Sequence, residues 1–359
     1  MKKNYTSFFL FLILVITFST NVNAQDDLEK TLSKLSSSAG KAYVNPVISA
    51  FGSNLNSGWV SILPPATKLG FHLNVKVIGM GSFFSDDVKK FNANGDFFFS
   101  QSQADQILQA SGYGTNHPAY ATLKNELTKA TFSVNFSGPT IVGSKNEGLK
   151  VKFPGKTIQS GNQSYTLQPY ELSIPEVKGF LDDLKIFPTA AVQATIGTVV
   201  GTNVSVRYFP SVNIEDMGKF TFWGVGAIHN PGAWLKNPLP LDIGVGYFMQ
   251  QMKVGDIFES NASQFGLYVG KTIGAIVSVS PYAGFTVESS KTTVKYNYQS
   301  NQVVNGVPVP PAKVEFELEG ENSTSFLIGL NIKLVAININ ADYKIAKTKT
   351  ASAGISVGL

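Results

Sequence analysis

The chain has 359 residues, a formal net charge of +5, 15% charged residues and no cysteine. An ordinary soluble domain carries roughly 25% charged residues, so this composition is poor in charge. The lack of cysteine excludes disulfide-stapled folds, thiol catalysis and zinc–thiolate sites. The charge is mild and contains no runs of one sign, so nucleic acid is not an expected partner.

The first residues have the pattern of a secretory signal peptide. Lys2 and Lys3 precede an apolar run from Phe8 to Phe18, and the small residues before Gln25 suit cleavage after Ala24. The alternative, a membrane-anchoring helix, would need about 20 apolar residues. Because no cysteine follows the cut, a lipid-anchored lipoprotein is excluded. We therefore expect export through a cleaved signal peptide, residues 1–24.

Residues 25–66 precede the first strand. Residues 26–37 read as a short amphipathic helix with acidic residues in its first turn. The stretch after it, "AYVNPVISAFGSNLNSGW", is rich in Gly, Asn and Ser and has few strand signals. We expect this segment to fold back into a barrel lumen as a plug or hatch. The alternative is a periplasmic helix and linker that lie outside the barrel.

Period-2 alternation of apolar and polar residues dominates residues 67–359. In residues 67–84 the apolar Leu69, Phe71 and Leu73 alternate with polar or small residues, which is the pattern of a strand with two different faces. The pattern recurs at 189–198, 204–208, 219–230, 241–250, 262–273, 277–287, 326–334, 337–345 and 350–359.

The composition of the two faces indicates a membrane barrel. One face of about ten strands is apolar without charges, and the other carries Gly, Ser, Asn and a few charges of both signs. An apolar outer band around a polar interior is typical of outer-membrane barrels, and only a closed barrel satisfies every strand hydrogen bond in lipid. A soluble sandwich or lipocalin-like barrel is the alternative. We predict an all-β membrane protein, a closed antiparallel transmembrane β-barrel of 10–14 strands, in the outer membrane of a Gram-negative bacterium.

The connections predict which end of the barrel is which. Tight periplasmic turns are expected near residues 200–202, 273–275 and 335, and extracellular loops at 255–262 and 299–313. The connection 231–239 is long for a periplasmic one. Residues 85–188 form a long extracellular insertion with helix-like and strand-like pieces. Any further barrel strands within this insertion must come in pairs. The last strand, 350–359, is expected to close against the first strand near Leu69–Val77 and to be recognised by the β-barrel assembly machinery.

No motif indicates catalysis. HExxH, GxSxG and P-loop patterns are absent, and the three histidines, at 72, 117 and 229, share no metal-ligand spacing. "GVGAIH" lies within a strand pattern and opens no helix. The sequence therefore predicts no enzyme activity, no cofactor and no metal.

Eight polar side chains fall on the lumen-facing phase of their strands and are the candidate site residues: His72, Asn74, Lys76, Arg207, Asp242, Gln250, Asp342 and Lys344. Arg207, the only arginine, could bind a substrate carboxylate with its forked guanidinium. Alternatively, it forms a lumen salt bridge with an acid such as Asp242 or belongs to a structural network. Asp342 and Lys344 are expected to balance each other across neighbouring strands.

Two family resemblances follow from these features. A hatch-like segment ahead of a barrel resembles the long-chain fatty-acid transporter (FadL-like) superfamily, which implies fourteen strands, although that family's hatch signature is missing. The motifs "YVNPVISAFGSNLNSGW", "GPTIVG", "VSVRYFP", "WGVGAIH" and "LPLDIGVGY" resemble an uncharacterised outer-membrane family of Bacteroidota. The same superfamily includes accessory proteins of a secretion system.

These features leave two hypotheses for function. The first is a passive uptake channel for hydrophobic or amphipathic small molecules, with outer-membrane lipid around it and a hydrophobic ligand inside. The second is a non-transporting structural or interaction barrel, such as a secretion accessory or adhesin. A porin for water-soluble solutes ranks third, because the lumen face has no obvious ring of charges.

Overall fold

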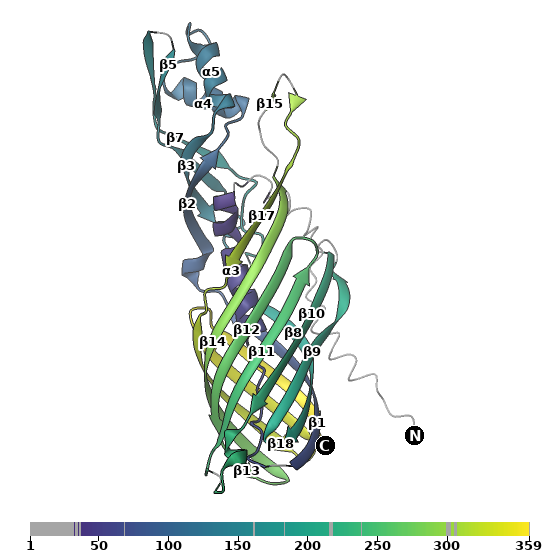
Figure 1. Ribbon diagram of the computed structural model, residues 1–359. Helices are drawn as coiled ribbons and strands as arrows, with labels where there is room; N and C mark the ends of the chain where they lie inside the picture. Colours follow the sequence, from purple (N-terminus) through teal and green to yellow (C-terminus); the bar gives the residue numbers. More distant parts are fainter. Residues whose placement is uncertain are drawn as a thin grey trace.

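The computed structural model describes residues 32, 35, 37–67, 69–160, 162–182, 184–214, 218–237, 239–298, 303–304 and 307–358. The predicted signal peptide, residues 26–31 of the predicted short helix and Leu359 lie outside these ranges. Figure 1 shows an elongated molecule with a barrel at one end and a smaller lobe at the other. Among the described residues, no helix combines the length and hydrophobicity needed to cross a lipid bilayer.

In the described part of the chain, ten antiparallel strands form a closed barrel. β12 pairs with β11 on one side and with β14 on the other, which closes the ring. The strands are β1 (Leu69–Phe83), β8 (Ile186–Val199), β9 (Thr202–Ile214), β10 (Gly218–His229), β11 (Asp242–Val254), β12 (Phe258–Gly270), β14 (Val277–Tyr298), β18 (Thr324–Leu334), β19 (Ile337–Ile345) and β20 (Thr350–Gly358). The predicted closed antiparallel barrel is confirmed at the lower limit of its strand count, and fourteen strands is wrong.

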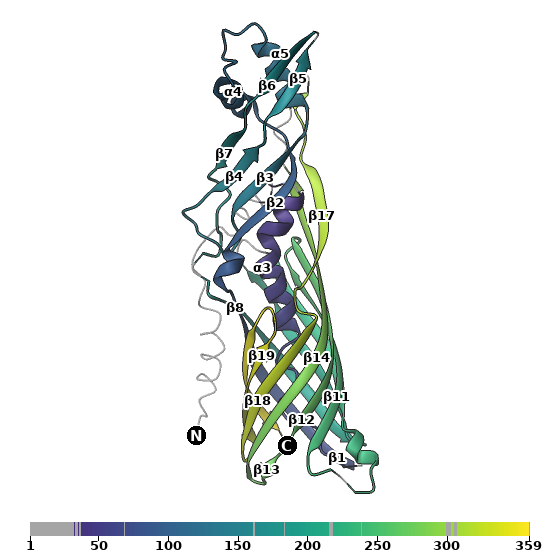
Figure 2. The same cartoon turned by 90° about the vertical axis from the view of Figure 1, so that its left-hand side faces the viewer.

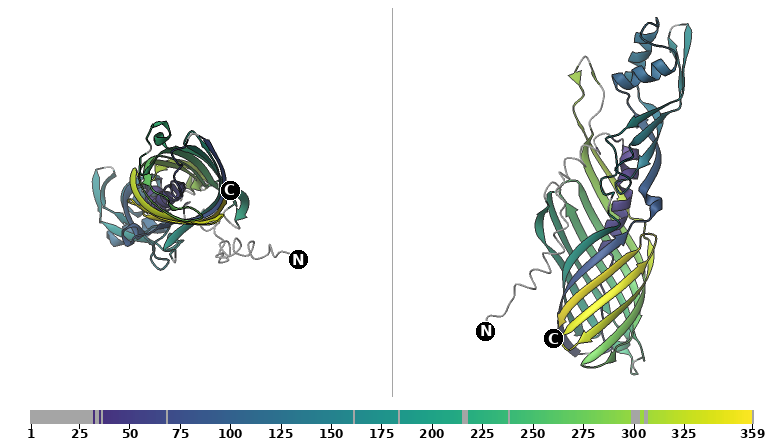
Figure 3. Two further views of the ribbon diagram at one scale, coloured as in Figure 1. Left: turned by 90° about the horizontal axis from the view of Figure 1, so that it is seen from below. Right: turned by 180° about the vertical axis from the view of Figure 1, so that it is seen from behind.

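The first and last strands meet as predicted. β1 pairs with β20 from Asn74 opposite Gly358 to Ser82 opposite Thr350, and with β8 on its other edge. The chain therefore closes the barrel by joining segments about 280 residues apart in sequence. Figure 3 shows the ring of strands from below.

The two faces of the barrel wall differ as the alternation predicted. Large apolar side chains point outward and are exposed, among them Val206, Leu267 and Ile328, whereas polar side chains such as Gln264 and Asn331 point inward and are buried. This apolar-out, polar-in arrangement is the reverse of a soluble barrel. A soluble sandwich or lipocalin-like barrel is therefore wrong.

Tight turns gather at one end of the barrel, which we call the turn end. Val200 and Gly201 have φ of 48° and 69°, Val335 has 60° and Gly274, in the two-residue strand β13 (Ile273–Gly274), has 100°. These turns lie where the sequence predicted them. The longer connection after β10 is also here and contains the 3-10 helix η2 (Pro231–Trp234).

The opposite, head end carries the two largest connections. One runs from β14 to β18 and contains β15 (Val303–Val304), β16 (Val307–Pro308) and β17 (Ala312–Glu319), which extends the barrel wall by pairing with β14. By contrast, the predicted loop 255–262 is only a three-residue turn, because β12 already begins at Phe258. Short hairpins therefore occur at both ends.

Residues 85–185 form a separate lobe, which we call the head (Figure 2). Its core is a four-stranded sheet, ordered β2-β3-β4-β7, with a hairpin and two short α-helices beside it. The elements are η1 (Asp86–Lys89), β2 (Lys90–Phe97), α4 (Gln101–Ala110), α5 (Tyr120–Lys129), β3 (Phe132–Pro139), β4 (Leu149–Phe153), β5 (Lys156–Ser160), β6 (Gln163–Leu167) and β7 (Tyr170–Ile174). None of these described strands joins the barrel, so the extra barrel strands allowed for 85–188 are wrong.

One long helix links the two lobes. α3 (Ser37–Leu55) starts beside the head sheet and ends within the ring of barrel strands (Figures 2 and 3). The sequence predicts a helix at 26–37 and shows only few strand signals after it. A helix forms over Ser37–Leu55 despite Pro46 and Gly52 in its interior, because packing on all sides outweighs poor helix propensity.

Candidate functional site

The candidate site is the end of α3 inside the barrel. The last carbonyls of a helix lack partners within the helix, and the helix dipole places partial negative charge there. α3 has no basic residue in its last turn, so any compensating charge has to come from elsewhere. Every residue from Val47 to Val60 is buried, so water cannot solvate this end freely.

The barrel wall supplies that charge. Three buried basic side chains donate to carbonyl oxygens at or just beyond the end of α3: Lys344 Nζ to Ser53 O (2.8 Å) and Asn56 O (3.4 Å), Arg207 Nη1 to Ser57 O (2.9 Å), and Lys76 Nζ to Gly58 O (2.8 Å). We call Lys76, Arg207 and Lys344 the cationic cap. They come from β1, β9 and β19, so the cap spans much of the ring and holds the helix end from several sides.

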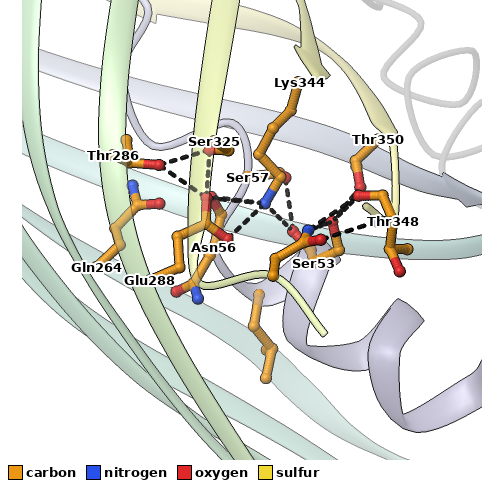
Figure 4. Close-up of polar contacts among 12 residues, drawn as sticks. Ser53, Asn56, Ser57, Gln264, Thr286, Glu288, Ser325, Lys344, Thr348 and Thr350 are labelled. Carbon is orange, nitrogen blue, oxygen red and sulfur yellow. Dashed lines mark hydrogen bonds and ion pairs between the residues drawn. The ribbon is translucent and has the colours of Figure 1, made fainter. Parts of the chain in front are cut away.

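Lys344 also forms a buried ion pair, drawn in Figure 4. Its Nζ lies 3.0 Å from Glu288 Oε2, and both side chains are only 1% exposed. Thr286 and Ser325 donate to Glu288 Oε1 at 2.8 and 2.6 Å. A buried pair is favourable only when its remaining hydrogen-bonding capacity is satisfied, and here the wall hydroxyls and the helix carbonyls satisfy it.

Arg207 is fully buried, with 0% exposure. Its Nε donates to Gln193 Oε1 at 2.9 Å, and its guanidinium carbon lies 4.0 Å from the ring centroid of Trp59. Trp59 in turn stacks on Phe248 at 4.8 Å. The expected salt bridge from Arg207 to Asp242 is wrong, because Asp242 accepts instead from Asn230 Nδ2 at 3.2 Å. Of the three alternatives, the arginine's contacts fit a structural network.

A hydroxyl cluster fixes α3 to the seam between the first and last strands. Ser53 Oγ lies 2.6 Å from Thr350 Oγ1, and Thr350 Oγ1 lies 2.8 Å from Ser82 Oγ. Ser82 also donates to Asn54 Oδ1 at 2.7 Å. Thus one turn of the helix bonds to both strands that close the barrel.

The upper half of α3 packs in the head. Tyr43 Oη donates to Lys178 O at 2.9 Å, and the backbone amide of Ile141 donates to Tyr43 O at 3.0 Å. Burial raises the pKa of the Tyr43 phenol, so it stays a neutral hydrogen-bond donor. Val44 and Ile48 share one continuous apolar core with the head strands.

The other predicted residues either line a pocket, together with Lys76, or are buried. Lys76, His72 and Asn74 line a pocket of about 330 Å³ near the turn end. Asp342 is buried and accepts from Tyr282 Oη at 3.1 Å; its charge acts on Lys344, but the direct ion pair of Lys344 is with Glu288. Gln250 is buried, and neither side-chain polar atom has a partner among the described residues.

The sequence reading missed Glu288, Ser53 and Trp59. Glu288 follows Thr286 on the inward phase of β14, so extending the alternation by one more step would have found it. Ser53 and Trp59 carry no such signal, because they belong to a segment without alternation. Within the described residues, no three potential metal-ligating side chains gather at one place. The hydrogen bonds and the ion pair described for the site anchor the end of α3 to the barrel wall.

Comparison with known proteins decides the family. All of residues 1–359 match a family of unknown function, DUF6588. The chain belongs to this family. No curated protein matches the chain. The predicted membership of an uncharacterised family agrees with this match, and nothing in it points to fatty-acid transporters.

Several solved outer-membrane proteins are weakly similar to this DUF6588 member. A loop-deletion mutant of OmpT from Vibrio cholerae is 9% identical, with 81% of this chain and 98% of that chain covered and a TM-score of 0.22. A bacterial polysaccharide outer membrane secretin is 8% identical, with coverage of 79% and 97% and a TM-score of 0.22. OpdK from Pseudomonas aeruginosa is 8% identical, with coverage of 81% and 99% and a TM-score of 0.16. Likeness at these scores is too weak to assign an activity.

Proposed function

We propose that this protein is an outer-membrane β-barrel that presents the head at the cell surface while α3 keeps the lumen closed. It is thus a non-transporting interaction barrel with no enzyme activity and no cofactor. One observation carries the proposal: α3 belongs to the head core and to the barrel interior at once. Withdrawing the helix from the lumen would break the cationic cap and also its packing against the head, which makes α3 a poor gate.

The apolar outer face supports the membrane placement. Exposed Val, Leu, Ile and Phe side chains cover the barrel strands, and lipid solvates such a surface better than water does. We infer export by the N-terminal signal and recognition of residues 350–359 by the β-barrel assembly machinery. The head end then faces outward, because the largest connections of outer-membrane barrels are extracellular.

Single cysteines test the orientation, since the chain has none of its own. Ser164→Cys places a thiol on the exposed hairpin of the head, and Lys271→Cys places one at the turn end. A membrane-impermeant maleimide should label Ser164→Cys in intact cells and Lys271→Cys only after lysis. Labelling of both in intact cells, or of Lys271→Cys alone, would refute this orientation.

Engineered disulfides test closure. Ser53→Cys with Thr350→Cys tethers α3 to the wall, since the native hydroxyl oxygens are 2.6 Å apart. Ser82→Cys with Thr350→Cys is the matched control, because it joins two directly paired wall strands and leaves α3 untethered. In planar bilayers we expect no conductance from the wild type or from either pair, oxidised or reduced. A wild-type conductance that persists with the helix tethered would contradict closure by α3.

A second candidate is the uptake channel for hydrophobic or amphipathic small molecules. The pocket of about 330 Å³ at the turn end favours it, since a transported molecule needs a binding site along its path. The same disulfides separate the two candidates. Conductance or solute uptake that the oxidised Ser53–Thr350 tether alone abolishes, and that reduction restores, would support the channel and overturn the closed barrel.

A further inference from the structure

The pocket at the turn end lies beside the segment that follows α3. Trp59, Leu63, Ile228 and Phe248 form an apolar side of it. Trp59 and Phe248 stack on each other, and Arg207 lies 4.0 Å from the Trp59 ring centroid, so Leu63 and Ile228 complete the apolar lining beside them. The volume, about 330 Å³, is at the lower end of the roughly 300–1,000 Å³ that small-molecule sites occupy.

The polar side of the pocket is basic. Lys76, His72 and Lys333 line it, and among the described lining residues there is no Asp or Glu. A lumen usually balances its charges, as Glu288 does for Lys344. The lining of this pocket places basic donors next to apolar side chains.

Lys76 has donor capacity to spare. Its ammonium carries three N–H groups, and two of them are used by Gly58 O and Ser61 Oγ, both at 2.8 Å. Both acceptors are neutral, and the buried carboxylate whose charge acts on Lys76, that of Asp342, lies outside the pocket lining. A fixed, buried ammonium that still has a free N–H is well suited to donate to a carboxylate.

We propose that this pocket binds a small organic anion, a carboxylate on a flat apolar body such as an aromatic acid. The flat body lies among the apolar lining residues Trp59, Leu63 and Ile228, and the carboxylate accepts from Lys76 with His72 and Lys333 nearby. The volume excludes a long acyl chain within the pocket. This site does not depend on whether the barrel transports, so its test is separate from that of lumen closure.

The test uses tryptophan fluorescence of the full chain in detergent micelles. The chain has three tryptophans, so replacing Trp223 and Trp234 by Phe leaves Trp59 as the sole reporter. The probe is 4-bromobenzoate, whose bromine quenches on contact, and 4-bromobenzyl alcohol is its neutral counterpart. We expect saturable quenching by the acid, with a Kd about tenfold below that of the alcohol, because a charge-assisted hydrogen bond is lost with the carboxylate.

Variants assign the effect to the pocket. Lys76→Gln should raise the Kd for the acid by about tenfold. Lys333→Gln should raise it by a smaller factor and leaves the cationic cap intact, so it remains informative even if Lys76→Gln fails to fold. Lys236→Gln, an exposed lysine of the turn end outside the pocket, should have no effect. Linear quenching, equal affinity for acid and alcohol, or an unchanged Kd in Lys333→Gln would overturn the proposal.

Discussion

Lys344→Met should strongly destabilise the protein, because it leaves Glu288 buried without its counter-ion. At an effective dielectric constant of about 20, opposite charges 3.0 Å apart attract by about 5–6 kcal/mol before the cost of desolvation. Removing one partner of a buried pair typically costs about 3–5 kcal/mol. Methionine keeps most of the side-chain volume, so packing changes little. The same substitution also removes the donors to Ser53 O and Asn56 O, which frees the end of α3.

Urea unfolding in detergent, followed by tryptophan fluorescence, measures this loss. Lys291→Met is the matched control, because Lys291 lies on β14 like Glu288 and pairs with Glu317 at 2.8 Å, but the two side chains are 51% and 54% exposed. Solvent screens such a pair, so the control should leave the midpoint nearly unchanged. Lys344→Met combined with Glu288→Gln should recover part of the loss, and Glu288→Gln alone completes the cycle that gives the coupling energy. Equal midpoints for Lys344→Met and Lys291→Met would show that burial does not strengthen the ion pair of Lys344 with Glu288.

Two further predictions concern packing and pH. A Cβ on Gly52 would lie 2.0 Å from Ser290 Oγ and 2.7 Å from its Cβ, so Gly52→Ala should lower the free energy of unfolding in urea by about 1–3 kcal/mol, although alanine favours helix. Ser290→Gly should rescue this variant, and the control Gly114→Ala, with open space around it, should be neutral. A neutral Gly52→Ala would show that α3 is not held against the wall. In the head, a hydrogen bond from Lys124 lowers the pKa of Asp105. This pair therefore stabilises the head above the unfolded pKa of about 3.9 and loses its effect as the pH falls through the lower, folded pKa. A dye on the head should report a urea midpoint that drops on acidification less in Asp105→Asn than in the wild type, and equal drops would contradict the assignment.

The barrel could be predicted from the sequence because each membrane strand faces lipid on one side and the polar lumen on the other. Every second residue of strands such as β11 and β18 faces outward, and this phase is apolar from Ile243 to Met249 and from Phe326 to Leu334. The tight turns were visible for a related reason: the apolar phase flips at Val335, where the backbone takes a positive φ. Lumen-facing residues such as Arg207 followed from the same phase.

The strand count and the helical form of the lumen segment could not be predicted in the same way. Segments such as β3 and β4 also alternate, but their buried face packs on the helices and hairpin of the head. Alternation alone does not show whether a strand belongs to the barrel wall or to another sheet. α3 was hidden because Pro46, Gly52 and several Ser and Asn residues give it low intrinsic helix propensity. Its helical form depends on surroundings that only the folded barrel and head provide.

The position of the cationic cap links the plug to barrel closure. Its cations come from β19, β1 and β9, which lie on both sides of the β1–β20 seam in the sheet order β19-β20-β1-β8-β9. Pairing β1 with β20 joins the most distant parts of the barrel sequence, so it carries the largest loop-closure cost. α3 bonds to this seam through Ser53 and Thr350. The carbonyl groups at the end of α3 receive all their donors from the cationic cap only when β1, β9 and β19 are in place. Helix docking and seam closure therefore stabilise each other, and weakening the cap should open the barrel first between its first and last strands.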